Sequence, residues 1–292
     1  MRRWIAACVI ISALFGCRRT QHRLPSSSAK VGEVLVVGDS NGQLSNFLSQ
    51  PEPGLPQPEP RFDVRRLSNS QFKGNALLAR AIVILGDKSY ASGTDLNARP
   101  QIVIEASVKD SLRVLRDLEA FEEKNAYAFL RRHGNPMMEE KVRRQFGVRM
   151  VVPEEMRASK ASKDFLWMAT TGAENLRSLC VFRMPYASKG GAVEEINRCL
   201  SQNIHGETPS SPMQIVMETV KCGKEQGLDV LTGLWNMEND AMGGPFVASV
   251  KPMRHGSIVL LAFAYAPERE KRNIMRQLRA VVCNDHIIYG EQ

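Results

Sequence analysis

A serine nucleophile is the first chemistry that this sequence could support. Residues 38–41, Gly-Asp-Ser-Asn, follow an apolar β-rich run, and some hydrolases place the catalytic serine, here Ser40, directly after a strand. That serine needs a histidine base and an aspartate partner. The spaced Asp and His of such hydrolases are hard to find here, and the nearest substitute is the adjacent pair Asp285-His286 close to the C-terminus. The same residues also suit a strand-to-helix turn capped by Ser40, which needs no missing partner. We favour the turn and keep a hydrolase with a serine- or carboxylate-based site as the alternative.

Residues 239–246, Asn-Asp-Ala-Met-Gly-Gly-Pro-Phe, form the most suggestive binding motif. A glycine pair permits positive φ or a close approach of backbone to a ligand. Asn239, Asp240, Gly243 and Gly244 are therefore predicted to line a ligand- or partner-binding site. The competing interpretation is a glycine turn between two strands with Asp240 as its cap, and we favour that turn. The order of residues does not match a phosphate-binding loop.

A proline-rich segment supplies the other predicted binding residues. Residues 50–60 read Gln-Pro-Glu-Pro-Gly-Leu-Pro-Gln-Pro-Glu-Pro, and the prolines exclude a helix or a central strand. Glu59 and the nearby Asp63 are predicted to contact a ligand or partner, beside the 239–246 motif. An extended loop of this kind could bind a groove of another protein, but it more often wraps its own domain.

The N-terminus indicates where the protein functions. Residues 1–17, MRRWIAACVIISALFGC, combine two arginines, a short apolar run and a cysteine. The run is shorter than the roughly 20 residues that span a bilayer, and it is typical of a secretory signal. Its end resembles the lipobox of bacterial lipoproteins, which implies lipid attachment such as palmitate at Cys17. We expect a signal peptide over 1–16 and a polar, flexible tether over 17–30.

Composition restricts the partners. Removal of residues 1–16 takes away Arg2 and Arg3 and lowers the formal net charge from +8 to +6. Neither a nucleic-acid-binding motif nor a dense basic block is present, so no nucleic acid is expected. The expected partners are the membrane, through the lipid anchor, and an envelope protein or polymer. No cofactor or metal is predicted, and the location is the outer or inner membrane, facing the periplasm.

Four cysteines besides Cys17 belong to the expected mature chain, namely Cys180, Cys199, Cys222 and Cys283. They lack the spacing of a zinc site. Cys180 and Cys283 lie in apolar runs, which predicts small buried side chains. Free thiols are the preferred interpretation, with one disulfide as the alternative that the compartment allows.

The order of elements predicts an α+β fold with mixed and antiparallel sheets and flanking helices. In the first half, over 31–153, expected strands at 33–37, 81–85, 101–106 and 148–152 alternate with helices at 41–48, 109–132 and 136–146. This βαββαβ order suggests a ferredoxin-like half. In the second half, over 154–292, strands at 165–170, 179–184, 213–220, 228–235, 245–250 and 258–265 predict an antiparallel sheet with two helices, 192–200 and 267–282. The two halves are expected to pack as one globular unit.

Five segments resemble one family. They are residues 55–63 (LPQPEPRFD), 163–167 (KDFLW), 233–235 (GLW), 239–246 (NDAMGGPF) and 265–273 (YAPEREKRN). Together they resemble the Bacteroidota lipoprotein family catalogued as domain of unknown function 4837, with a likeness from about residue 24 to 283. The resemblance implies an envelope lipoprotein and transfers no catalytic residue. We therefore predict a non-enzymatic binding or assembly protein of the envelope.

Overall fold

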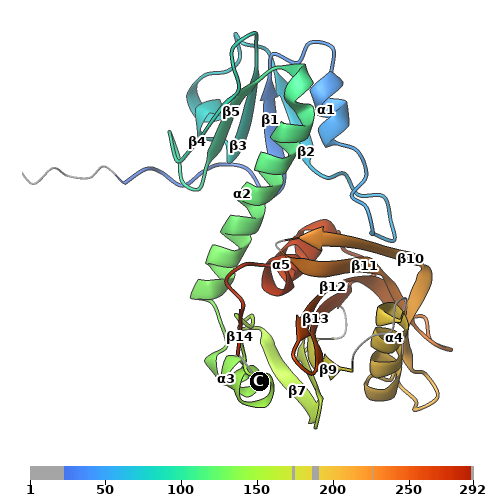
Figure 1. The fold of residues 1–292 in the computed structure, drawn as a ribbon. Helices are drawn as coiled ribbons and strands as arrows, with labels where there is room; N and C mark the ends of the chain where they lie inside the picture. The colour runs from blue at the N-terminus through green and yellow to red at the C-terminus, as the bar shows by residue number, and fades with distance from the viewer. Residues whose placement is uncertain (1–22, 173–174, 186–190, 226, 291–292) are drawn as a thin grey trace, which may run out of the picture.

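The computed structural model describes residues 23–172, 175–185, 191–225 and 227–290. Cys17 and the expected signal peptide lie outside this range. Two β-sheets are joined by one long helix, as Figure 1 shows, and the mixture of helices with mixed and antiparallel sheets confirms the α+β class.

The first sheet is mainly parallel. Its strand order is β2-β1-β3-β5-β4, where β1 is Glu33–Val37, β2 Asp63–Leu67, β3 Ala81–Leu85, β4 Ala91–Thr94 and β5 Ile102–Ala106. The pairs β1–β2, β1–β3 and β3–β5 are parallel, and only β4–β5 is antiparallel.

The expected ferredoxin-like arrangement of this half is therefore wrong. Strand β2, Asp63–Leu67, was not predicted. It lies at the edge of the sheet and its sequence DVRRL, with exposed arginines, lacks the apolar pattern of a buried strand. It takes the place beside β1. The last expected strand, 148–152, lies outside this sheet, since only Val148–Arg149 (β6) forms a strand and it pairs with Ile288–Tyr289 (β14).

Helices cover one face of the first sheet. Side chains of β1, β3 and β5 pack there against α1 (Gln43–Leu48) and the start of α2 (Ser111–Arg132). The 3-10 helix η1 (Gly74–Leu78) adds cover to the opposite face, and a second one, η2 (Val108–Asp110), leads into α2.

The second sheet is antiparallel throughout, as predicted. Its order is β10-β11-β12-β13-β9-β8-β7, with β7 at Met156–Ser162, β8 Phe165–Thr170, β9 Leu176–Met184, β10 Met213–Glu225, β11 Leu228–Met237, β12 Gly243–Met253 and β13 Gly256–Tyr265.

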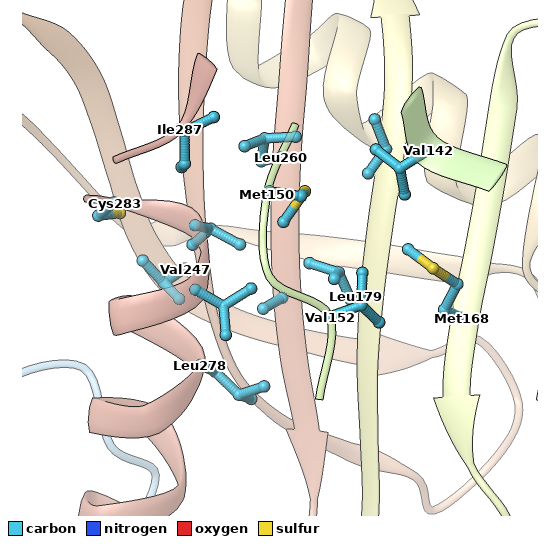
Figure 2. Close-up of a cluster of buried hydrophobic side chains, with 14 of the residues drawn as sticks. Val142, Met150, Val152, Met168, Leu179, Val247, Leu260, Leu278, Cys283 and Ile287 are labelled. Atoms are coloured by element: carbon cyan, nitrogen blue, oxygen red, sulfur yellow. The ribbon is translucent and has the colours of Figure 1, made fainter. Parts of the chain in front are cut away.

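Helices cover both faces of this sheet. On one face, α3 (Pro136–Phe146) and α5 (Arg272–Val282) pack on the apolar side chains drawn in Figure 2, among them Leu260 and Leu278. On the other face lies α4 (Ala192–Asn203). Helix α5 begins at Arg272, not at Pro267 as expected, because residues 267–270 form a turn.

Helix α2 connects the two cores. Its 22 residues span about 33 Å. Val114 and Leu118 are buried against the first sheet, whereas Leu130 belongs to the core of the second.

The proline-rich segment forms a second connection, which we call the strap (residues 50–60). As expected, it contains neither helix nor strand. A bridge between Pro51 and Pro60 and a 2.7 Å hydrogen bond from the Glu52 N–H to the Glu59 carbonyl close its base. In Figure 1 the strap extends from the first sheet towards α5 and the second sheet.

Candidate functional site

Glu59, predicted to bind a ligand, instead holds the start of α5. Its side chain is buried, and its carboxylate accepts hydrogen bonds from the backbone N–H groups of Lys271 (2.8 and 3.0 Å) and Arg272 (2.8 Å). A helix begins with unpaired N–H groups and a partial positive charge, so a carboxylate is stabilising there. Lys271 provides no side-chain cap of its own. Glu59 therefore caps a helix 212 residues further along the chain.

Asp63 is also bonded within the fold. Its two carboxylate oxygens accept hydrogen bonds from Arg272 at 3.2 and 2.7 Å, and the same guanidinium donates to the Pro60 carbonyl at 2.7 Å. The Arg272 side chain is only 2% exposed, so it requires these partners.

Arg276, one turn further along α5, anchors the strap from the same helix face. Its guanidinium donates to the Arg61 carbonyl, lies 4.4 Å from the centre of the Phe62 ring and approaches Glu52 at 3.9 Å. Burial lowers the pKa of Arg276. Gly32 lies against it at φ 83°, where an added Cβ would come within 2.9 Å of the guanidinium. The arginines of this helix face are thus turned towards the fold and not towards solvent.

The 239–246 motif is a hairpin turn followed by a strand. Asn239 has a positive φ of 57°, and the Met237 N–H donates to the Met242 carbonyl at 2.9 Å across the turn. This confirms the turn between strands, although its positive φ falls on Asn239 and both glycines belong to β12. A Cβ on Gly244 would overlap the carbonyl oxygen of Ala264, so strand packing requires that glycine.

The six predicted binding residues do not form one site. Glu59 and Asp63 contact the start of α5, whereas the turn of Asn239 and Asp240 lies against residues 206–212.

A cleft lies between the strap and the second sheet, and residues other than the six predicted ones line it. They are Glu52, Pro53, Gly54, Leu55, Thr232, Pro245, Phe246, Val247, Arg272, Met275, Arg276 and Arg279. Its volume is about 70 Å³, below the roughly 300 to 1,000 Å³ of typical small-molecule sites.

Sequence reasoning missed the α5 side of this cleft. Arg272, Arg276 and Arg279 recur at helical spacing, which places them on one face. That spacing was a usable signal, but only the tertiary structure shows which face is covered.

The serine-based alternative lacks its partner. Ser40 is exposed, and Asp39 rather than Ser40 caps α1, because the Asp39 carboxylate accepts from the Ser45 N–H (2.8 Å) and hydroxyl (2.6 Å). His286 stacks on Tyr127 with ring centres 4.8 Å apart. In Figure 1, α1 and the β14 end of the chain lie at opposite ends of α2, which separates Ser40 from this histidine.

The cysteines of the second half are free thiols, as preferred. Cys180, Cys199 and Cys283 are buried, and burial raises the pKa of each, that of Cys283 to about 12. Cys222 is exposed on β10. Within the ranges that the structure describes, no three His, Cys, Asp or Glu side chains gather to hold a metal ion. Nor does any helix in those ranges combine the length and apolar content needed to cross a membrane.

One protein family matches the part of the chain that forms the second sheet and its helices. The domain of unknown function DUF4837 matches residues 135–283. The chain belongs to this family. The matched range is shorter than the expected range of 24–283. Residues 27–141 instead match a different family, the domain of unknown function DUF8532. The two matches overlap over residues 135–141, at the start of α3.

No curated protein matches the chain. A crystal structure of a protein from Bacteroides thetaiotaomicron VPI-5482 is 7% identical with a TM-score of 0.28, over 50% of this chain and 46% of that one. The solution structure of cyanobacterial PsbP (CyanoP) from Synechocystis sp. PCC 6803 is 14% identical with a TM-score of 0.31, over 49% and 87%. The chain thus spans about half the length of the first, and likenesses this low carry no argument about function.

Proposed function

We propose that this chain is a non-enzymatic envelope protein, anchored through a lipid on Cys17, that binds an extended segment of another envelope component in the cleft beside the strap. The observation that supports it is the combination of a small cleft with carboxylates that are already bonded. Glu59 and Asp63 hold α5, and Glu52, which lines the cleft, lies 3.9 Å from Arg276, so none of the three is free to act as acid or base.

The lining of the cleft fits an extended, largely apolar segment. Leu55, Phe246 and Met275 offer apolar contacts. Arg272, Arg276 and Arg279 are already bonded to Asp63, the Arg61 carbonyl and Glu225 and leave little charge free for a ligand. The small volume disfavours a compact small molecule.

Site-specific photo-crosslinking tests the cleft. A photoreactive residue at Leu55, in the lipidated protein within intact envelopes, is expected to give one discrete adduct. The same residue at Leu96, which is 57% exposed in the bend that follows β4, provides the control. Thr232→Arg adds a large side chain to the cleft lining from β11 and is expected to abolish the Leu55 adduct while the unfolding midpoint stays unchanged. Absence of an adduct at Leu55, or equal adducts at both positions, would refute the cleft as the binding site.

The anchor is tested separately by intact-protein mass spectrometry. The mature chain is expected to begin at Cys17 and to carry the added mass of its acyl chains. Cys17→Ser is expected to lose this mass and to stop processing at that position. A mature chain cleaved elsewhere and free of lipid would remove the anchor from the proposal and leave the cleft untouched.

A further inference from the structure

The turn between α2 and α3 exposes two large apolar side chains, one of which, Phe129, also stacks on the exposed His133 with ring centres 4.3 Å apart. Phe129 is 48% exposed and Met137 is 62% exposed, while their neighbours Leu130 and Met138 are buried in the core of the second sheet. We call residues 129–149 the basic corner. Its helices have already buried one apolar face, so Phe129 and Met137 are additional exposed apolar surface.

The basic corner also carries a net positive charge. Six Lys or Arg side chains and two Glu give residues 129–149 a net charge of +4. Glu140 pairs with Arg143 and Arg144, each at 2.6 Å. Arg131, Arg132 and Arg149 have no carboxylate within 4.0 Å among the residues that the structure describes.

The preference for cations at the C-terminal end of a helix explains only some of the positive charges of the basic corner. Arg131 and Arg132 occupy the last turn of α2, where cations interact favourably with the helix dipole. Met137, Lys141 and Arg144 recur at helical spacing along the exposed side of α3, opposite the buried Val142. An apolar residue flanked by cations on one exposed helix face is typical of helices that lie at a membrane surface.

We propose that the basic corner rests on an anionic phospholipid surface, with Phe129 and Met137 entering the headgroup region and the surrounding cations facing lipid phosphates. Lipid is the occupant that the chemistry favours. The two apolar side chains lie in a segment of net positive charge, which suits insertion between anionic headgroups. This contact goes beyond the cleft and depends on neither the cleft nor the anchor.

Fluorescence quenching by brominated lipids tests the contact on the mature full-length protein. Phe129→Trp places the reporter, and the parent protein gives the background of Trp167 and Trp235. In vesicles of phosphatidylcholine and phosphatidylglycerol (3:1), quenching of the new tryptophan is expected at low salt and should weaken as salt screens the charges. Pure phosphatidylcholine vesicles are expected to give none.

Charge-reversal variants distinguish binding through the basic corner from an effect of the protein's overall charge. Arg131→Glu with Arg132→Glu is expected to lower the apparent partition coefficient at least tenfold, since each cation near an anionic surface contributes about fivefold. Arg65→Glu with Arg66→Glu, an adjacent exposed pair on β2, is the matched control and is expected to have a much smaller effect.

Three outcomes would overturn the proposal: equal quenching in both kinds of vesicle, no quenching in either, or equal losses from both charge pairs. If the lipid anchor alone brings the protein to vesicles, sedimentation occurs without quenching at position 129, and this contact is refuted while the anchor stands. Crosslinking of an acidic protein at Phe129, with no quenching, would assign the corner to a protein partner instead.

Discussion

The core of the second sheet and the contact between the strap and α5 achieve stability by different means. The core consists of apolar side chains on both faces of seven antiparallel strands. The strap contact consists of arginines, carboxylates and backbone carbonyls, arranged around Glu59, Asp63 and Arg276. Charged residues that resemble a binding site in the sequence can therefore serve entirely to join parts of a fold.

Truncation in the apolar core should have the largest effect. Leu260 is fully buried on β13 between β9 and β12 (Figure 2). Leu260→Ala is expected to lower the free energy of unfolding by about 3 to 5 kcal/mol, because a cavity forms in a packed interior. Urea denaturation measures it, with the exposed Leu96→Ala as a control near zero. A loss below 1 kcal/mol would show that this core is loosely packed.

Removal of the strap's cap on α5 should have the next largest effect. Glu59→Ala leaves the Lys271 and Arg272 N–H groups without an acceptor in a buried place, and about 2 to 3 kcal/mol of unfolding free energy should be lost. Glu59→Gln keeps an acceptor oxygen and should lose less. If both variants are as stable as the parent protein, Glu59 is not structural and its role in ligand binding becomes open again.

Asp240 should behave unlike Glu59. Its side chain lies at the hairpin turn beside Gly206, and Asp240→Ala is expected to change the unfolding free energy by no more than about 0.5 kcal/mol. The same urea experiment, run beside Glu59→Ala, compares the two groups of predicted site residues. A loss above 1.5 kcal/mol would place Asp240 among the structural carboxylates.

The smallest effect concerns a carboxyl group on α2. Burial, and next the nearby Glu52, raise the pKa of Glu119 above its usual value. A raised pKa means that the folded state binds the proton more tightly than the unfolded state does. The stability that protonation provides is thus present at low pH and is lost as the pH rises through the folded-state pKa.

Glu119→Gln should therefore stabilise the protein slightly at pH 7 and have almost no effect at pH 4. Thermal unfolding at the two pH values measures this difference. Glu119→Asp, which retains the charge, is the control and should not show the gain. A Gln variant that is less stable at pH 7 would show that Arg276 outweighs the burial of Glu119.

The sequence determined most of the elements because their signals are local. Strands β1, β3 and β8 and helix α3 begin and end where the pattern of apolar residues predicted. Asn135 caps α3 and Gly147 ends it at a positive φ of 73°. The antiparallel second sheet was also predictable, because hairpins join strands that are neighbours in the chain.

Only the tertiary structure decided what the polar residues do. Glu59 meets Arg272 across 213 residues, and parallel pairing places β2 beside β1, a position that no local pattern specifies. Composition and spacing show that a carboxylate is present, but they do not show whether it faces water or the N–H groups of a distant helix. That choice depends on which surfaces the packed cores bring together, because a buried charge is stable only where partners meet it.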